Sequence, residues 1–419
     1  MNSYLSNYRF GERLFNSIPK SNTSLIVVIP CHNEPDLISS LNALFSCQIP
    51  PSIAVEVIVV INAGFDAEEE IKNQNQSTLE LAKTWSQENQ KENIDYLFYL
   101  NNNLPKKLAG VGLARKIGMD EAVDRFNQIN GEEGVIVCFD ADSKCDSNYL
   151  SEIYNSFSQN RKAPGASIYY EHPLEGDEFQ SHIYDGIIQY ELFLRYYRQA
   201  FKFTEHPQAF HTVGSSMAVK TWAYQKQSGM NKRKAGEDFY FLQKIIQLGD
   251  FMEINSTRVI PSPRTSDRVP FGTGRSMLEY LDGDKMETTY SFHSFQDVKI
   301  FIELFLKEYE TNKLYDNTFL KSLPLSIQSF LEQNDFEVRI KDMLEYGTNT
   351  SSFSKRFYNW FNAFRVLKFI HFSRDAFYEN ESILFGCKSV LSKLNISVGS
   401  DTESLAMLGK FRLLDKNPA

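Results

Sequence analysis

The stretch Leu25–Pro30 (LIVVIP), followed at once by the polar residues 31–34 (CHNE), decides the fold of this chain. A run of apolar, mostly β-branched residues predicts a strand covered on both faces, because a half-exposed strand would alternate. Pro30 is expected to end the strand. Pro35 and a series of apolar residues at helical spacing between Leu37 and Phe45 then predict a helix. A buried strand leading into such a helix is typical of an α/β sheet.

The same alternation continues through the first half of the chain. Val55–Ile61 (VEVIVVI) and Val135–Phe139 (VIVCF) predict two more buried strands, and Ile94–Leu100 predicts a partly alternating one. Helical stretches, Leu79–Trp85 and part of Ala109–Phe126, lie between them. Strands and helices in this order predict a doubly wound, mostly parallel α/β sheet, in which ligands bind outside the carboxyl ends of the strands.

The pattern changes near residue 275, where amphipathic helices separated by Gly, Asn and Ser take over. The predicted helices are Met277–Tyr280, Val298–Tyr309, Leu325–Glu332, Val338–Leu344, Phe357–Phe369 and Ile383–Leu394. We therefore expect an α/β domain over residues 1–275 and a helical C-terminal domain over residues 276–419.

The composition of the 419 residues is that of a globular protein, with 42% hydrophobic and 23% charged residues. The 33 Phe and 21 Tyr favour large aromatic cores over sugar stacking. A net charge of −9 argues against a nucleic-acid partner.

Five cysteines without C-x-x-C spacing predict free thiols in a reducing compartment. No signal peptide and no transmembrane helix are evident, so we expect a cytoplasmic protein, with peripheral contact at the inner face of the membrane as an alternative.

Asp140-Ala141-Asp142 comes directly after the strand VIVCF. Two carboxylates two residues apart at a strand end can face one crevice. They suit Mg²⁺ or Mn²⁺, which prefers oxygen ligands and keeps positions open for phosphate. The alternative is a loop that merely solvates two acids, because D-x-D is frequent by chance. The position after a buried strand favours the metal site.

Two further segments that follow predicted strands are candidates for ligand binding: the polar residues after the first strand and a glycine-containing segment after the third. Asn33 and Glu34 lie where a nucleobase could be bound, although capping of the next helix explains them equally well. Gly110–Gly118 (GVGLARKIG) is not the dinucleotide fingerprint, because Arg115 stands where its third glycine is needed. Its glycines could still bring backbone close to a ligand, and Arg115 or Lys116 could meet phosphate. The alternative is a helix start with solvated bases.

Gly236-Glu237-Asp238 (GED) opens another predicted helix. Its expected apolar face consists of Phe239, Leu242, Ile245 and Ile246, with Gly249 as the stop. Acids at a helix N-terminus are favoured by the dipole, so stabilisation of the helix end is the plain interpretation. The functional interpretation is a fixed, ionised carboxylate that accepts a proton from an attacking hydroxyl.

Together these elements resemble the family 2 glycosyltransferases, whose catalytic domain has the GT-A fold. The resemblance runs from about Ser24 to Arg275. It comprises IPCHNE, a second strand ending in Asn62, the GVGLARKIG segment, the DAD motif (residues 140–142) and GED, with Gly214–Ser216 between the last two. Each motif is loose, but their order and spacing are specific to the family.

The resemblance implies inverting transfer of a sugar from a nucleoside-diphosphate donor, a UDP-sugar being slightly favoured, to a hydroxyl. The acceptor would be a glycan, a lipid-linked molecule or a small molecule, as in glycan or cell-surface polysaccharide assembly. Asp140 and Asp142 would hold Mg²⁺ or Mn²⁺ on the diphosphate. Asp238 would be the general base, and Glu237 would position the acceptor.

The resemblance also implies which residues line the two sides of the site. The donor side would consist of Pro30, Asn33, Glu34, Asn62, Arg115, Asp140, Ala141, Asp142 and Arg268. The acceptor side would consist of Gly214, Ser215 and Ser216. Arg264 and Arg268, in the segment PRTSDRVPFGTG, resemble the arginine motif that some processive members place over the diphosphate. A surface loop with ordinary arginines is the alternative.

Two departures from the family stand out. Asn62 occupies a position where members commonly carry Asp, and an amide is uncharged, so the nucleobase is left open. Missing membrane-spanning helices argue against a synthase that extrudes its product. A nucleotidyltransferase that makes a sugar donor is one alternative, but it would need a Gly-rich, basic loop after the first strand, which CHNEP is not. An inactive nucleotide-sugar-binding module is the other, and it requires that the DAD and GED acids do not face one cleft.

Overall fold

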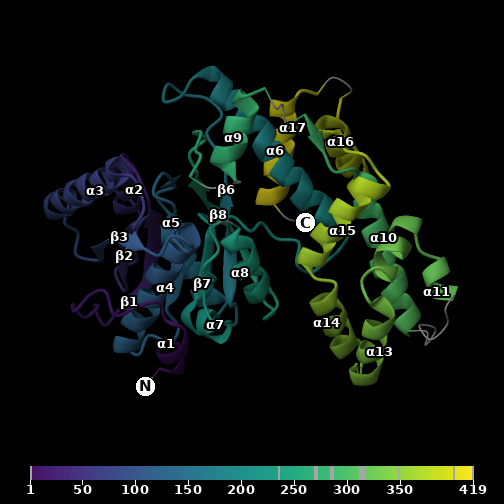
Figure 1. Cartoon of the computed structure of the whole chain (residues 1–419), viewed down its shortest axis with the longest axis horizontal. Coiled ribbons are helices and arrows are strands. Elements are labelled where there is room, and N and C mark those ends of the chain that lie inside the picture. Colours follow the sequence, from purple (N-terminus) through teal and green to yellow (C-terminus); the bar gives the residue numbers. More distant parts are fainter. Residues whose placement is uncertain are drawn as a thin grey trace. The chain divides into compact units, whose positions relative to one another are not determined.

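The structure, a computed structural model, describes residues 2–234, 236–268, 272–283, 287–310, 318–347, 349–399 and 402–417. It divides into two compact units (Figure 1). The first consists mainly of Met1–Ile187 and Thr212–Asp282, and the second mainly of Ile188–His211 and Gly283–Asp415. Residues 188–211 therefore belong to the second unit although they precede part of the first in the sequence.

The first unit is built on one eight-stranded sheet in the order β3-β2-β1-β4-β7-β6-β8-β5. The strands are β1 Thr23–Cys31, β2 Ala54–Gly64, β3 Ile94–Leu104, β4 Val135–Cys138, β5 Lys144–Cys145, β6 Gly165–Tyr170, β7 Met217–Lys220 and β8 Met252–Ile260. Strands β1 to β4 are parallel, β7 is antiparallel to both β4 and β6, β8 is parallel to β6, and β5 is antiparallel to β8. The expected fold class is confirmed at the level of architecture: a mixed, largely parallel α/β sheet followed by a helical C-terminal region.

Pro30 does not end the first strand, as the sequence had suggested. β1 continues to Cys31, and Pro30 pairs in register with Val60 of β2. On the other side of β1, the pairing with β4 stops at Val28. A proline, which has no N–H to donate, is tolerated where one side of a strand has lost its partner.

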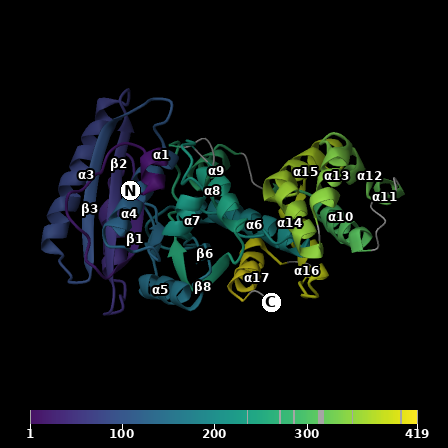
Figure 2. The same cartoon turned by 90° about the horizontal axis from the view of Figure 1, so that it is seen from below.

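The helices of the first unit cover both faces of the sheet. They are α1 Ser3–Tyr8, α2 Leu37–Phe45, α3 Glu69–Glu88, α4 Val111–Gln128, α5 Tyr149–Gln159, α7 Thr221–Lys226, α8 Glu237–Ile246 and α9 Thr273–Leu281. Figure 2 shows α3 and α4 on opposite sides of β2 and β3. Since α4 is buried along nearly its whole length, it can hold charged side chains at the edge of the sheet without exposing them to bulk water.

The second unit is helical. Its long helix α6, Ser181–Phe203, begins in the first unit and belongs to the second from Ile188 onward. The other helices are α10 Phe292–Glu310, α11 Thr318–Lys321, α12 Leu325–Glu332, α13 Phe336–Tyr346, α14 Thr350–Trp360, α15 Ala363–Ala376, α16 Ile383–Lys393 and α17 Ser404–Lys416. A short ribbon pairs β9, Thr288–Thr289, with β10, Glu381–Ser382. None of the described helices is long and apolar enough to cross a membrane.

One of the predicted C-terminal helices is in fact two. The stretch Phe357–Phe369 was expected to be continuous, but α14 ends at Trp360 and α15 begins at Ala363. Asn362 breaks the run, because its side chain accepts a hydrogen bond from the backbone N–H of Arg365 and so caps the new helix.

Phenylalanine side chains form the core of the second unit. Phe305 of α10 contacts the rings of Phe353 and Phe357 of α14 at centroid distances of 5.4 and 4.6 Å. Phe301, one turn earlier, lies 5.0 Å from Phe361 in an edge-on arrangement. The aromatic excess of the sequence thus serves core packing here, as the composition favoured.

Candidate active site

The residues predicted to carry chemistry gather at the carboxyl ends of β1, β2 and β4. The DAD motif follows β4, with Ala141 buried between two acids that remain partly open to solvent. The side chains of Asp140 and Asp142 are 35% and 31% exposed. Loss of hydration raises the pKa of Asp142 to about 6, although the nearby charge of Arg264 acts in the opposite direction.

Arg115 of α4 connects the two acidic motifs. Its guanidinium is buried, and the whole residue is only 3% exposed. One terminal nitrogen contacts Oε1 of Glu237, and the other lies 2.5 Å from Oδ1 of Asp140. A single side chain therefore joins the first acid of DAD to the first acid of GED, and its charge compensates the buried carboxylate of Glu237 as well as the partly exposed carboxylate of Asp140.

The two acids of GED have different surroundings. Gly236 adopts a left-handed backbone conformation, with φ of 68°, and α8 begins directly after it. Glu237 is buried against Arg115, whereas Oδ1 of Asp238 accepts a hydrogen bond of 2.7 Å from the backbone N–H of Phe239.

Burial raises the pKa of both GED acids. For Glu237 the pKa rises to about 7, because loss of hydration and the neighbouring Asp238 outweigh the charge of Arg115. For Asp238 burial likewise raises the pKa, against the opposing effect of Arg115 and of the backbone N–H groups. The helix dipole was expected to keep these acids fully ionised, but burial is the stronger influence here. A carboxylate with a raised pKa is the better proton acceptor.

A second ion-pair cluster lies at the end of β1. Glu34 is 1% exposed, and its two carboxylate oxygens contact the guanidinium of Arg264. Arg268 approaches the same carboxylate at 3.1 Å and donates to the backbone oxygen of Asn33 at 2.8 Å. Burial alone would raise the pKa of Glu34, but the two arginines lower it. Arg264 also reaches Oδ2 of Asp142 at 2.7 Å, so it links β1 to the DAD motif.

These contacts decide between the alternatives left open for two segments. The N-cap position of α2 is Asp36 and not Asn33 or Glu34, although Oε1 of Glu34 accepts a hydrogen bond of 3.1 Å from the backbone N–H of Asp36. Arg264 and Arg268 are not ordinary surface arginines, because both pair with the buried Glu34. Residues 269–271 of the same segment lie outside the described residues.

Amide side chains hold the ends of β1, β2 and β3 together. Asn62 donates through its side-chain amide to the backbone oxygen of Cys31 at 2.9 Å. Asn75 of α3, which is completely buried, accepts from the backbone N–H of Asn33 at 2.9 Å. Its amide nitrogen donates to the backbone oxygen of Asn62 at 3.0 Å and to Oδ1 of Asn102 at 2.9 Å. Asn75 escaped sequence reasoning because it lies in a helical stretch of similar polar residues.

The glycines of GVGLARKIG serve packing and do not open the backbone to a ligand. A Cβ on Gly112 would overlap the backbone oxygen of Arg233 and the side chain of Glu237. Lys116 is buried as well, 3.0 Å from Asp120 and 3.1 Å from the hydroxyl of Tyr4. It is therefore neither a solvated base nor a group that faces a phosphate site.

The predicted acceptor-side residues lie close to the acids but differ in access. Gly214 packs against the guanidinium of Arg115 so closely that a Cβ would overlap it. Ser215 and Ser216 precede β7, and both side chains are buried, with their hydroxyl oxygens 3.5 Å apart. The structure thus brings the backbone of Gly214 to the site and turns the two serine hydroxyls into the protein.

The donor set fits a divalent metal that is completed by substrate. Within the described ranges, no group of three or more His, Cys, Asp or Glu side chains is placed to hold a metal ion. Asp140 and Asp142 each have one oxygen paired with an arginine, which leaves the other oxygen for a metal. Mg²⁺ commonly takes one or two carboxylates and completes its shell with phosphate oxygens and water. The two aspartates suit that arrangement, and Mn²⁺ accepts the same ligands.

Comparisons with known proteins give only distant likenesses. No protein-family model and no curated protein matches the sequence. Residues 1–349 of S. aureus TarS in complex with UDP-GlcNAc share 12% identity over 80% of this chain and 90% of that one, with a TM-score of 0.40. The same TarS fragment in complex with UDP shares 12% identity over 91% and 94% of the two chains, with a TM-score of 0.38. Likenesses of this degree leave the activity to be argued from the site itself.

Proposed function

We propose that this chain is an inverting, metal-dependent glycosyltransferase that transfers a sugar from a nucleoside-diphosphate donor to a hydroxyl. A UDP-sugar is the favoured donor. The acceptor class is a glycan, a lipid-linked molecule or a small molecule. The chemistry is assigned to the first unit, because the clustered acids and arginines described above all lie there.

The observation that carries this proposal is the double contact of Arg115. An inactive binding module would require that the DAD and GED acids face different places. The reach of one guanidinium joins Asp140 to Glu237, so the two motifs border the same site. A metal-holding pair and a proton acceptor side by side are what transfer from a diphosphate donor needs.

Asp238 is proposed as the general base. As the acceptor oxygen bonds to the anomeric carbon, its proton passes to the carboxylate of Asp238, and the bond between that carbon and the diphosphate oxygen breaks. A single displacement of this kind inverts the anomeric configuration. The backbone N–H of Phe239 orients the carboxylate of Asp238, and Glu237 is held by Arg115.

On the donor side, Asp140 and Asp142 would hold Mg²⁺ or Mn²⁺, which supplies Lewis-acid neutralisation of the diphosphate leaving group. Arg268 and Arg264 lie beside Asp142 and Glu34 with side chains 29% and 23% exposed, so they can contribute positive charge to the same diphosphate. Asn62, fixed to Cys31, is proposed to border the nucleoside together with Pro30 and Asn33.

Thermal unfolding with nucleoside diphosphates tests this proposal. UDP at about one hundred times its Kd should stabilise the protein by about 2.7 kcal/mol in Mn²⁺. The stabilisation should be much smaller in EDTA or in Asp142→Asn. Asp95→Asn serves as the control, because this exposed acid of the same unit forms its one ion pair within the described residues with Lys20. Equal stabilisation with and without metal would overturn the metal's part, and no response to any nucleoside diphosphate would overturn the function.

A further inference from the structure

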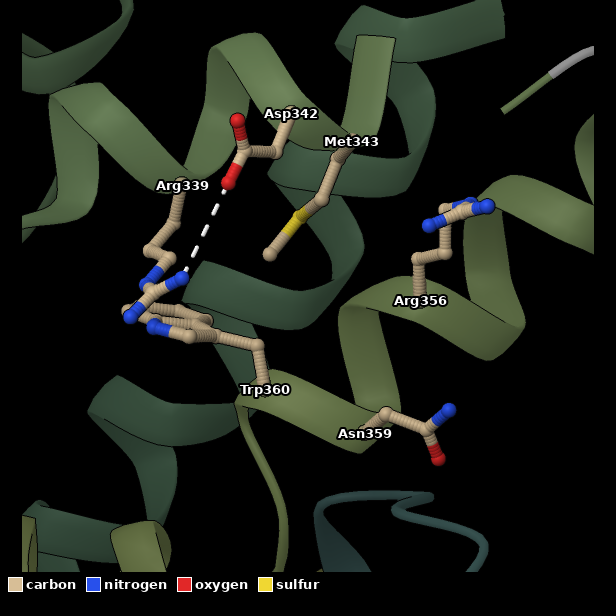
Figure 3. A pocket seen from close by; sticks show the side chains of 6 residues that line it. All are labelled: Arg339, Asp342, Met343, Arg356, Asn359 and Trp360. Atoms are coloured by element: carbon tan, nitrogen blue, oxygen red, sulfur yellow. Dashed lines mark ion pairs between the residues drawn. The ribbon is translucent and has the colours of Figure 1, made fainter. Parts of the chain in front are cut away.

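A pocket of about 320 Å³ lies between α13 and α14 of the second unit, and none of the residues assigned above lines it (Figure 3). It is lined by Arg339, Asp342 and Met343 of α13 and by Arg356, Asn359 and Trp360 of α14. Its volume is at the lower end of the range for small-molecule sites. Figure 3 shows the two arginines on opposite sides of the opening.

The pocket carries an excess of positive charge. Arg339 and Asp342 are 3.7 Å apart and 54% and 55% exposed, a separation too long for a hydrogen bond. Arg356 donates through Nε to the backbone oxygen of Tyr346 at 3.2 Å, and this bond does not use its terminal nitrogens. The charge of Arg365 lies 4.5 Å above the ring of Trp360. The pocket lining therefore contains two guanidinium groups, those of Arg339 and Arg356, and one weakly paired carboxylate.

Hydrogen-bonding groups without protein partners line the same pocket. Nε1 of Trp360 is buried, and within the described residues it has no acceptor. The side chain of Asn359 is exposed, and no hydrogen bond to its amide occurs in the described part of the chain. Met343 is buried and supplies an apolar surface beside them. The pocket thus combines three features: guanidinium groups that can bind an anion, hydrogen-bonding groups that can bind hydroxyls, and an apolar surface that can contact ring carbons.

We propose that this pocket binds a saccharide unit that carries a phosphate or carboxylate group. Arg339 and Arg356 would hold the anionic group, and Trp360, Asn359 and Asp342 would bond to hydroxyls. The carboxylate of Asp342 would repel a ligand made only of anionic groups, and the pocket is concave, so a nucleic acid or a flat membrane surface fits less well. If the proposed function holds, this pocket anchors part of an anionic glycan acceptor, but binding itself can be measured without any turnover.

The test uses the full chain labelled with ¹³C at the methionine methyl groups. Met343 reports on the pocket, and its signal can be assigned with Met343→Leu. Glucose 6-phosphate, glucuronate, glucose and inorganic phosphate are titrated separately. We expect the Met343 signal to move with at least one of the two charged sugars, and to respond about tenfold more weakly to glucose and to inorganic phosphate. Comparing the two charged sugars tells which anion is preferred.

Variants locate the binding. Arg356→Gln and Trp360→Phe should each weaken binding of the charged sugar by about tenfold, because the first removes a guanidinium and the second removes the indole N–H together with part of the ring surface. Lys341→Gln removes a charge from an exposed position of α13 that does not line the pocket, and it should bind normally. No shift of Met343, equal binding of inorganic phosphate, or equal weakening by Lys341→Gln would overturn the proposal. UDP binding to the first unit is scored separately, so failure here does not count against the proposed function.

Discussion

Glu237 and Asp238 are adjacent in the sequence, yet their surroundings give them different tasks. Glu237 is buried and in contact with Arg115, which also holds Asp140. Asp238 is oriented by the backbone N–H of Phe239 and forms no direct ion pair with another residue of the described part of the chain. A carboxylate that is oriented but not directly paired with a cation is the one that can take up a proton from an acceptor hydroxyl.

Asp238→Asn should lower turnover by about 10²–10⁴-fold, because the amide keeps the size of the side chain but cannot act as a base. Donor affinity should stay within about twofold, since the diphosphate is assigned to other residues. Turnover is measured with any accepted sugar acceptor, and donor affinity is measured by calorimetry.

Glu237→Gln is the companion variant. It removes one partner of a buried ion pair, so it should lower the stability of the first unit by about 3 kcal/mol while affecting turnover less than Asp238→Asn does. Near-normal turnover in Asp238→Asn, or a loss of donor binding in its place, would make Glu237 the next candidate for the base.

Helix α4 shows how one element positions the site. It packs directly on β1 and β2, and Gly118 makes the close approach possible, because a Cβ there would overlap Cγ1 of Val28 and crowd Val60. Arg115 lies one turn earlier on the same helix. The position of the guanidinium between the two acidic motifs therefore depends on the depth at which α4 lies against the sheet.

Gly118→Ala should destabilise the protein by about 1–3 kcal/mol, although alanine is the better helix former, because the added methyl group is forced into packed core. Gly409 of α17 is the matched control. A Cβ there meets nothing within 4 Å, so Gly409→Ala should stabilise by about 0.5–1 kcal/mol. Urea unfolding of each variant and of the parent protein measures both changes in the free energy of unfolding. Stabilisation by Gly118→Ala would show that α4 does not need its close approach.

The sequence patterns predicted two kinds of element well: helices that bury one apolar face, and strands whose side chains are nearly all apolar and buried. The strands LIVVIP, VEVIVVI and VIVCF are found at β1, β2 and β4, and the helix after GED is α8. Helix α6 was missed because it buries charges: Glu191 and Arg195 pair inside the second unit, and Arg195 also contacts Asp415. Buried ion pairs erase the apolar period on which helix prediction depends.

The acidic residues of the candidate site could be predicted from the sequence, but the ion pairs that join them could not. The DAD and GED motifs could be read from strand ends and helix starts. That Arg115 joins them depends on contacts with residues 25 and 122 positions away, and that Arg264 joins Glu34 to Asp142 depends on contacts with residues 230 and 122 positions away. Local spacing carries no information on such pairs, and the contact of Asn75 with Asn33, 42 positions away, is equally hidden from it.

At the scale of the whole molecule, the helical unit has its own dependence on pH. Burial lowers the pKa of His206 to about 4, and the hydrogen bond between Nε2 and the backbone oxygen of Phe361, 2.7 Å long, only partly opposes this. In the unfolded chain the imidazole takes up a proton near pH 6.5. Between pH 6.5 and 4 the unfolded state therefore binds more protons, and stability falls as the pH is lowered.

The expected loss is about 3 kcal/mol over that range. His206→Gln, which can still donate to Phe361, should show a flatter stability profile between pH 7 and 4.5 than the parent protein. Urea unfolding at several pH values provides the comparison, and the difference between the two proteins removes the contribution of the carboxylates that titrate in both. Parallel profiles would show that His206 is protonated in the folded unit.

The division of the chain predicts the fate of a truncated protein. A single cut near residue 275, where the sequence pattern changes, or after Asp282, where the first unit ends, leaves residues 188–211 without the helices around them. Leu192 and Tyr196, which are fully buried in the intact chain, would then face water. Arg195 would also lose Asp415, its partner at 2.5 Å.

We therefore expect residues 1–282 to aggregate, or to unfold at a lower temperature than the full chain, when examined by size-exclusion chromatography and circular dichroism. The cause is the exposure of apolar surface on α6 and not a defect of the sheet. The same truncation with Leu192→Gln and Tyr196→Gln should recover solubility and bind UDP with Mn²⁺ as the full chain does. If the unmodified truncation is monomeric and as stable as the full chain, residues 188–211 do not depend on the second unit. If the solubilised form is folded but does not bind UDP, the donor site needs more than the first unit.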